Sequence, residues 1–142
     1  MSESLTVKFD LESNNFDRAG TASSKIKKML QQIGVPNDVI RRIAIGTYEG
    51  EINVIIHSEG GFVEAEFFTD HTEIRIIDVG PGIPNLELAL QEGYSTASAY
   101  AREMGFGAGM GLPNMRRCSD DFEISSEVGK GTSIIMKFKH KQ

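Results

Sequence analysis

The stretch GFGAGMGLPN, residues 105–114, carries more structural information than any other part of this 142-residue sequence. From position 105 to position 111 every second residue is glycine, so the backbone can adopt positive φ angles and bring its N–H groups against a ligand. Pro113 suits the first turn of a helix, where a missing N–H costs nothing. Because a glycine loop that opens a helix presents free amides and the positive dipole end together, the stretch predicts an anion-binding site. The candidate binding residues are Gly105, Gly107, Gly109, Gly111 and Leu112.

A second glycine motif, DVGPGI, spans residues 78–83 and follows an apolar run. A carboxylate at Asp78 can accept a hydrogen bond from an exocyclic amine such as that of adenine, where an apolar floor excludes water. Gly80 and Gly82 would let the base approach the backbone, with Ile83 beside it. Taken alone, the motif is equally consistent with a simple turn of the Asp-x-Gly type.

A third candidate element lies on a helix predicted over residues 37–57. Glu49, Asn53 and His57 recur every fourth residue and therefore share one stripe of that helix. An Asn side-chain oxygen suits Mg²⁺, and a carboxylate one turn away can orient or deprotonate an attacking hydroxyl. His57 at the helix end is explained as well by capping or packing. An exposed polar face remains the alternative for the whole stripe.

The hydrophobic pattern predicts an α+β fold, a two-layer sandwich of helices on one face of a mostly antiparallel mixed sheet. Residues 1–142 are expected to form a single domain. The irregular segment 80–104 contains one short helical stretch at 86–91 and predicts a lid between the two glycine motifs. The remaining helices are expected at 16–33, 37–57 and from 112, and the strands at 4–11, 62–69, 72–79, 122–126 and 132–139.

Composition excludes several classes of protein. A net charge of −5 argues against a nucleic-acid partner, and the basic residues 137–141 are interpreted as a solvated tail. No stretch is long and apolar enough for a membrane span, and the N-terminus has no hydrophobic signal region. A single cysteine, Cys118, fits a reducing cytoplasm and an unreactive thiol.

Together these motifs resemble the GHKL ATPase superfamily, which includes DNA gyrase, Hsp90, histidine kinases and MutL and has the Bergerat ATP-binding fold. Glu49 to Asn53, the 78–83 motif, the 107–112 glycines and Gly131-Thr132 occur in the family's order and spacing. The resemblance implies that ATP and Mg²⁺ are bound, with Asn53 as metal ligand, Glu49 as general base and Asp78 on the adenine amine. It implies that Gly80 and Gly82 shape the adenine pocket and that the phosphates lie on the glycines beneath a lid at 84–107. Thr132 would support Asp78.

Within that superfamily, segments 101–117 and 126–132 look like the bacterial anti-sigma factors and switch-protein serine/threonine kinases. This resemblance implies a cytoplasmic kinase that phosphorylates a STAS-domain regulator, with a sigma factor or a phosphatase as further candidate partners and a homodimer as a candidate state. The sequence departs from the pattern at Tyr48 and Glu51, and Gly50 weakens the helix by ~1 kcal/mol relative to Ala. The alternative is a non-catalytic module that binds ATP and sequesters a partner. The retained Glu49 favours catalysis.

Overall fold

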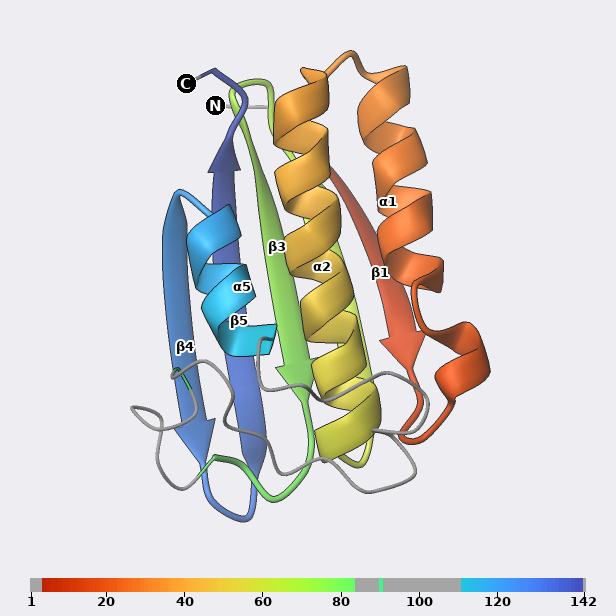
Figure 1. The fold of residues 1–142 in the computed structure, drawn as a ribbon, viewed down its shortest axis with the longest axis vertical. Helices are drawn as coiled ribbons and strands as arrows, with labels where there is room; N and C mark the ends of the chain where they lie inside the picture. The colour runs from red at the N-terminus through yellow and green to blue at the C-terminus, as the bar shows by residue number, and fades with distance from the viewer. Residues whose placement is uncertain (1–3, 84–89, 91–110, 142) are drawn as a thin grey trace.

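The computed structural model describes residues 4–83, 90 and 111–141, and it shows a sheet with helices packed on one of its faces (Figure 1). The strands are β1 (Leu5–Leu11), β2 (Gly61–Phe67), β3 (His71–Asp78), β4 (Asp121–Glu127) and β5 (Gly131–Lys139). They lie in the order β1-β2-β3-β5-β4, and each described pair of neighbours is antiparallel. The expected α+β sandwich is confirmed, and the part of the sheet expected to be mixed is antiparallel as well.

Three described helices cover one face of the sheet, with α2 (Asn37–His57) between α1 (Thr21–Gln32) and α5 (Gly111–Cys118) (Figure 1). The helix predicted from residue 16 is wrong over its first turn. Residues Phe16–Arg18 form a separate 3-10 turn, η1, and Gly20 then adopts a φ of 91° before α1 begins. Asn15, which precedes the 3-10 turn, makes no side-chain cap hydrogen bond.

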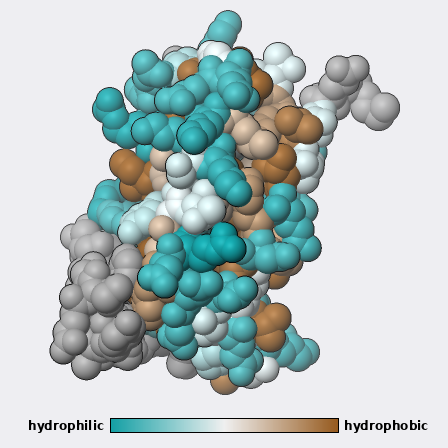
Figure 2. Space-filling view, turned by 90° about the vertical axis from the view of Figure 1, so that its right-hand side faces the viewer, coloured by the Kyte–Doolittle hydropathy of each residue, from teal (hydrophilic) through white to brown (hydrophobic). Residues whose placement is uncertain are grey.

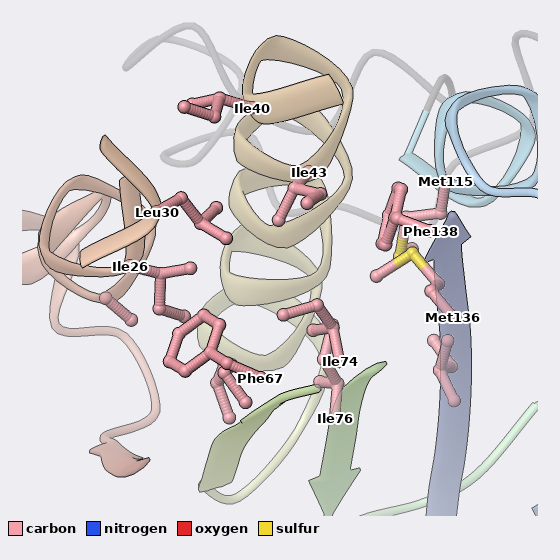
Figure 3. Close-up of a cluster of buried hydrophobic side chains, with 14 of the residues drawn as sticks. Ile26, Leu30, Ile40, Ile43, Phe67, Ile74, Ile76, Met115, Met136 and Phe138 are labelled. Atoms are coloured by element: carbon pink, nitrogen blue, oxygen red, sulfur yellow. The ribbon is translucent and has the colours of Figure 1, made fainter. Parts of the chain in front are cut away.

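The core lies between this helical layer and the sheet (Figure 3). Strand side chains alternate between the two faces, so β3 and β5 send every second residue toward the helices. Burial of one large apolar side chain contributes about 1.5–3 kcal/mol. Side chains that are completely or almost completely buried in this layer are Ile26, Leu30, Ile43, Ile74, Ile76, Met115, Met136 and Phe138.

Two glycines bring α2 unusually close to the sheet. A Cβ atom added at Gly50 would lie 1.9 Å from Cδ1 of Ile76 on β3. At Gly46, one turn earlier, it would lie 3.2 Å from Sδ of Met136 on β5. Packing therefore favours the glycine that weakens the helix, because a Cβ at position 50 would overlap the end of the Ile76 side chain unless neighbouring side chains shifted.

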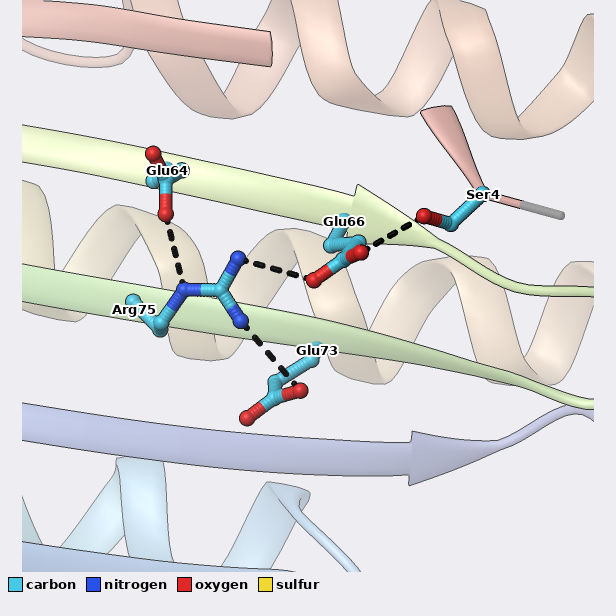
Figure 4. Close-up of polar contacts among 5 residues, drawn as sticks. All are labelled: Ser4, Glu64, Glu66, Glu73 and Arg75. Atoms are coloured by element: carbon cyan, nitrogen blue, oxygen red, sulfur yellow. Dashed lines mark hydrogen bonds and ion pairs between the residues drawn. The ribbon is translucent and has the colours of Figure 1, made fainter. Parts of the chain in front are cut away.

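The opposite face of the sheet carries a charged cluster around Arg75 of β3 (Figure 4). Its guanidinium contacts Glu64 at 2.8 Å, Glu66 at 3.0 Å and Glu73 at 3.2 Å. Ser4, just before β1, donates to Glu66 at 2.6 Å, and the hydrogen bonds from Ser4 and Arg75 lower the pKa of Glu66. The cluster thus links β2 and β3 with the residue that precedes β1, on the face that no described helix covers.

The C-terminal basic stretch is not a solvated tail over its described part. Lys137 and Lys139 are exposed, but they belong to β5 and alternate with the buried Phe138 and His140.

On the side formed by α1 and β1, hydrophobic patches are interrupted by hydrophilic side chains (Figure 2). Among the described helices none has the length and apolar character needed to cross a membrane.

Candidate functional site

Asp78 ends β3 with a half-buried carboxylate. Its Oδ1 atom accepts a hydrogen bond of 2.9 Å from the backbone N–H of Thr132, at the start of β5. Burial raises the pKa of Asp78 above its ordinary value, and the bond from Thr132 opposes that rise. No described residue donates to the second oxygen, Oδ2, so the carboxylate retains an acceptor for an N–H group of a ligand.

The chain that follows Asp78 is attached by three hydrogen bonds to β4 and to the turn between β4 and β5. The N–H of Gly80 donates to the Lys130 carbonyl at 3.2 Å, and the N–H of Gly129 donates to the Pro81 carbonyl at 2.9 Å. The N–H of Ile83 donates to Oγ of Ser126 at 2.7 Å. The second glycine motif is therefore held in place by β4 and β5, which are distant in sequence.

The glycines of this region permit close backbone contacts within the protein. Gly82 has a φ of 75°, and a Cβ atom there would lie 2.5 Å from the Glu127 carbonyl oxygen. At Gly131, with a φ of 143°, it would lie 2.2 Å from the carbonyl oxygen of Asp78. A Cβ at Gly80 would lie 3.1 Å from Cα of Ser58. These contacts explain the glycines without a ligand, and the expected approach of a base to Gly80 and Gly82 stays a prediction.

Glu49 faces the start of α5. Its Oε1 accepts a hydrogen bond of 3.3 Å from Nδ2 of Asn114, and its Oε2 lies 3.6 Å from the position that a Cβ at Gly111 would occupy. Asn53 lies one turn further along α2, partly buried and without a side-chain hydrogen bond to any described residue. Its amide oxygen is thus available as a metal ligand. Burial lowers the pKa of His57, which is consistent with a packing role.

The described residues form two pairs from the predicted site: Glu49 with Gly111, and Asp78 with Thr132. Leu112 is buried in the core, so its side chain packs against the protein interior. The lid predicted at 84–107, the helical stretch at 86–91, and Gly105, Gly107 and Gly109 lie outside the described residues, apart from position 90.

Glu51 is a buried acid whose role the sequence did not reveal. Its carboxylate is fully buried and accepts hydrogen bonds from the N–H groups of Gly20 at 3.0 Å, Ala22 at 3.2 Å and Ser23 at 3.1 Å. Burial raises the pKa of Glu51, and these N–H groups oppose the rise. The sequence feature that could have indicated this role is a second acidic residue on an isoleucine-rich helix, at a position outside the stripe that contains Glu49. Glu51 caps the N-terminus of α1 from α2.

Ser126 is a second residue that sequence motifs provided no reason to select. Its hydroxyl accepts from the N–H of Ile83 and lies 2.9 Å from Oγ1 of Thr132. It also donates to the Gly131 carbonyl at 3.2 Å. Ser126 therefore connects the segment after Asp78 with the strand that holds Asp78.

Residues 18–142 match the model of a protein family described as histidine kinase-, DNA gyrase B-, and HSP90-like ATPases. The chain belongs to this ATPase family. The match spans all the site candidates, from Glu49 to Thr132, and it confirms the resemblance to the GHKL superfamily. Membership implies a domain that binds ATP.

The relatives of the chain include proteins named anti-sigma F factor and a serine/threonine-protein kinase. An anti-sigma F factor of Clostridium beijerinckii is 32% identical over 143 residues, covering 95% of this chain and 93% of that protein. One of Clostridium acetobutylicum is 34% identical over 144 residues, covering 95% and 92%. The serine/threonine-protein kinase RsbT of Bacillus subtilis is 32% identical over 97 residues, covering 66% and 67%.

A solved structure also resembles the chain. It contains the RsbU and RsbW domains of a Mycobacterium tuberculosis protein and matches with a TM-score of 0.60 at 16% identity. The match covers 96% of this chain and 33% of that one. At this identity the likeness supports the fold alone.

Proposed function

We propose that this chain is an ATP-dependent protein serine/threonine kinase of the anti-sigma type, and that it phosphorylates a STAS-domain regulator in a partner-switching pathway. Relatives named as anti-sigma F factors and as a serine/threonine-protein kinase support the proposal. The observation that carries it is the position of Glu49. Its carboxylate lies against the first turn of α5, where the glycine-rich motif ends.

The proposed nucleotide site has a separate group for each part of ATP. Asp78, held through Oδ1 by Thr132, would accept the adenine amine at Oδ2. Asn53 would hold Mg²⁺, which supplies neutralising charge to the phosphates when bound. The amides from Gly105 to Gly111 would bind the phosphates at the start of α5, beneath a lid at 84–107.

Glu49 would act as the general base. In the transfer step the acceptor hydroxyl oxygen forms a bond to the γ-phosphorus, while the bond from that phosphorus to the β–γ bridging oxygen breaks. The hydroxyl proton moves to the Glu49 carboxylate, and the electron pair of the broken bond leaves with ADP. Because phosphoryl transfer depends mainly on positioning and charge, a carboxylate held at a defined place beside the phosphate motif suits this step.

A non-catalytic ATP-dependent module that sequesters a sigma factor is the second candidate, and the anti-sigma F factor relatives favour it. The two are separated by incubating the protein with γ-labelled ATP, Mg²⁺ and the candidate STAS proteins and sigma factors of its own genome. The kinase predicts label on a serine or threonine of one STAS protein. Tight binding of a sigma factor with no protein labelled would reject the kinase in favour of the sequestering module.

A further inference from the structure

A chain of hydrogen bonds on α5 leads to Glu49. Nη2 of Arg117 donates to Oδ1 of Asn114, and Nδ2 of Asn114 donates to Oε1 of Glu49 at 3.3 Å. A guanidinium can only donate and a carboxylate can only accept. The Asn114 amide therefore has one orientation that satisfies both neighbours. A flipped amide would place its NH₂ group against the Arg117 guanidinium and its oxygen against the Glu49 carboxylate.

This chain of contacts defines where the Glu49 carboxylate points. A glutamate side chain has three rotatable bonds, and the helical backbone of α2 disfavours only one of its χ1 rotamers, so several orientations remain open. Asn114 engages Oε1, while Oε2 lies over Gly111, where a Cβ atom would be 3.6 Å away. The orientation is thus set from α5, the helix that begins at the phosphate motif.

The contact between Glu49 and Asn114 is not needed to hold α2 and α5 together. The neighbouring residue on α5, Met115, is fully buried in the core, and its Sδ would lie 3.3 Å from a Cβ at Gly50 of α2. Leu112 is buried as well. Apolar packing already joins the two helices, so the part-buried polar contact beside it has no required structural task.

We propose that Asn114, oriented by Arg117, is the positioning residue for the Glu49 carboxylate in phosphoryl transfer. The inference rests on the proposed function, since it assigns the partner of the proposed base. Because the reaction rate depends steeply on the geometry of the reacting groups, loss of this hydrogen bond affects turnover more than nucleotide binding.

The kinetic test uses Asn114→Asp, which keeps the volume, loses the N–H donor and places a like charge beside Glu49. We expect kcat for phosphoryl transfer, or for ATP hydrolysis without an acceptor, to fall by about tenfold or more, and by a larger factor than the Kd for ATP rises through the charge added near the phosphates. Arg117→Ala should lower kcat in the same direction. Arg116→Ala is the matched control, since it removes an equal charge from the exposed side of the same helix and should leave kcat unchanged.

A double-mutant cycle with Glu49→Gln distinguishes positioning from a general structural effect. Asn114→Asp should cause no further loss of kcat in the Glu49→Gln background. An equal loss in both backgrounds, or an unchanged kcat in Asn114→Asp alone, would overturn the positioning role. A wild-type protein that binds ATP but neither transfers nor hydrolyses its phosphate would instead overturn the proposed function, and the positioning role with it.

The side-chain amide of Asn114 provides a readout independent of activity and of the stability of Asn114→Asp. Its NMR signal, in the full-length protein, should shift in Glu49→Ala and in Arg117→Ala. It should not shift in Glu123→Ala, which removes an exposed carboxylate from β4. A signal that is unaffected by Glu49→Ala would show that the two side chains do not interact in solution and would contradict the proposal.

Discussion

At the scale of single residues, burial of the Asp78 carboxylate lowers the stability of the fold, and we propose that the same carboxylate increases the affinity for ATP. Its carboxylate is half-buried and has one described hydrogen bond, from Thr132. We expect Asp78→Asn to leave the thermal midpoint of the nucleotide-free protein unchanged or higher, because the amide oxygen still accepts from Thr132 and no charge is buried. ATP affinity should fall at least tenfold, because the amide cannot replace the second acceptor. Calorimetry measures both, and equal affinities would contradict the assignment of Asp78.

The same carboxyl predicts a dependence of stability on pH. Because burial raises the folded-state pKa of Asp78, the folded protein retains a proton that the unfolded chain has lost. The contribution of Asp78 to stability is therefore present below its unfolded pKa of about 3.9 and is lost as the pH rises through the folded pKa. Urea unfolding from pH 3.5 upward should show a smaller loss of stability in Asp78→Asn than in the wild type. An equal loss of stability with rising pH in the two proteins would contradict this prediction.

Replacement of Glu51 should destabilise the fold more than replacement of an exposed glutamate close to it in sequence. Its two oxygens accept three N–H groups at the start of α1. In Glu51→Gln the amide NH₂ would face these donors, so at least one N–H loses its acceptor and the free energy of unfolding should fall by about 1–3 kcal/mol. The control is Glu59→Gln, an exposed residue just beyond the same helix. Equal stability of the two variants in urea would contradict the capping role.

At the scale of elements, the close contact of α2 with the sheet makes a direct prediction. Gly50→Ala places a methyl group 1.9 Å from Cδ1 of Ile76, so side chains must shift, and we expect a loss of about 1–3 kcal/mol despite the higher helix propensity of Ala. Gly46→Ala is the matched control, with its nearest atom a methionine sulfur at 3.2 Å. Stabilisation by Gly50→Ala would show that helix propensity, not packing, dominates at this position.

The elements also show which parts of the fold the sequence could predict. The hydrophobic pattern predicted the strands β1 and β3, and the helix expected to end at residue 33 ends at Gln32, two residues before Gly34, whose φ is 82°. The break at Gly20 was missed because its cause is distant: the N–H groups that follow are capped by Glu51, 28–31 residues later. Local periodicity carries no information about such a contact.

Some residues of the candidate site could likewise be predicted from the sequence, and others could not. Asp78 and Glu49 were selected from the sequence because the order and spacing of their motifs can be recognised there. Ser126 and the chain from Arg117 through Asn114 to Glu49 were not, since each joins elements that only the folded sheet and helices bring together. Asn114 lay within a recognised segment, yet only its hydrogen bonds indicate a role.

At the scale of the whole molecule, binding of ATP should stabilise the fold, because the proposed site joins α2, α5 and the ends of β3 and β5. At an ATP concentration 100 times the Kd, linkage contributes about 2.7 kcal/mol, which corresponds to a rise of roughly 5–10 °C in the thermal midpoint. Asp78→Asn should reduce this rise at the same concentration of ATP and Mg²⁺. A rise of equal size in both proteins would indicate that ATP binds elsewhere.

In the proposed function, Glu49 acts in the chemical step of an ATP-dependent kinase. Its most direct test measures the Kd for ATP and the rate of phosphoryl transfer to the acceptor, in wild type, Glu49→Ala and the control Glu123→Ala. A base acts in the transition state and contributes little to ground-state binding. We expect a similar Kd for all three proteins and a transfer rate lowered at least about a hundredfold in Glu49→Ala alone. Transfer by Glu49→Ala at the wild-type rate would contradict it.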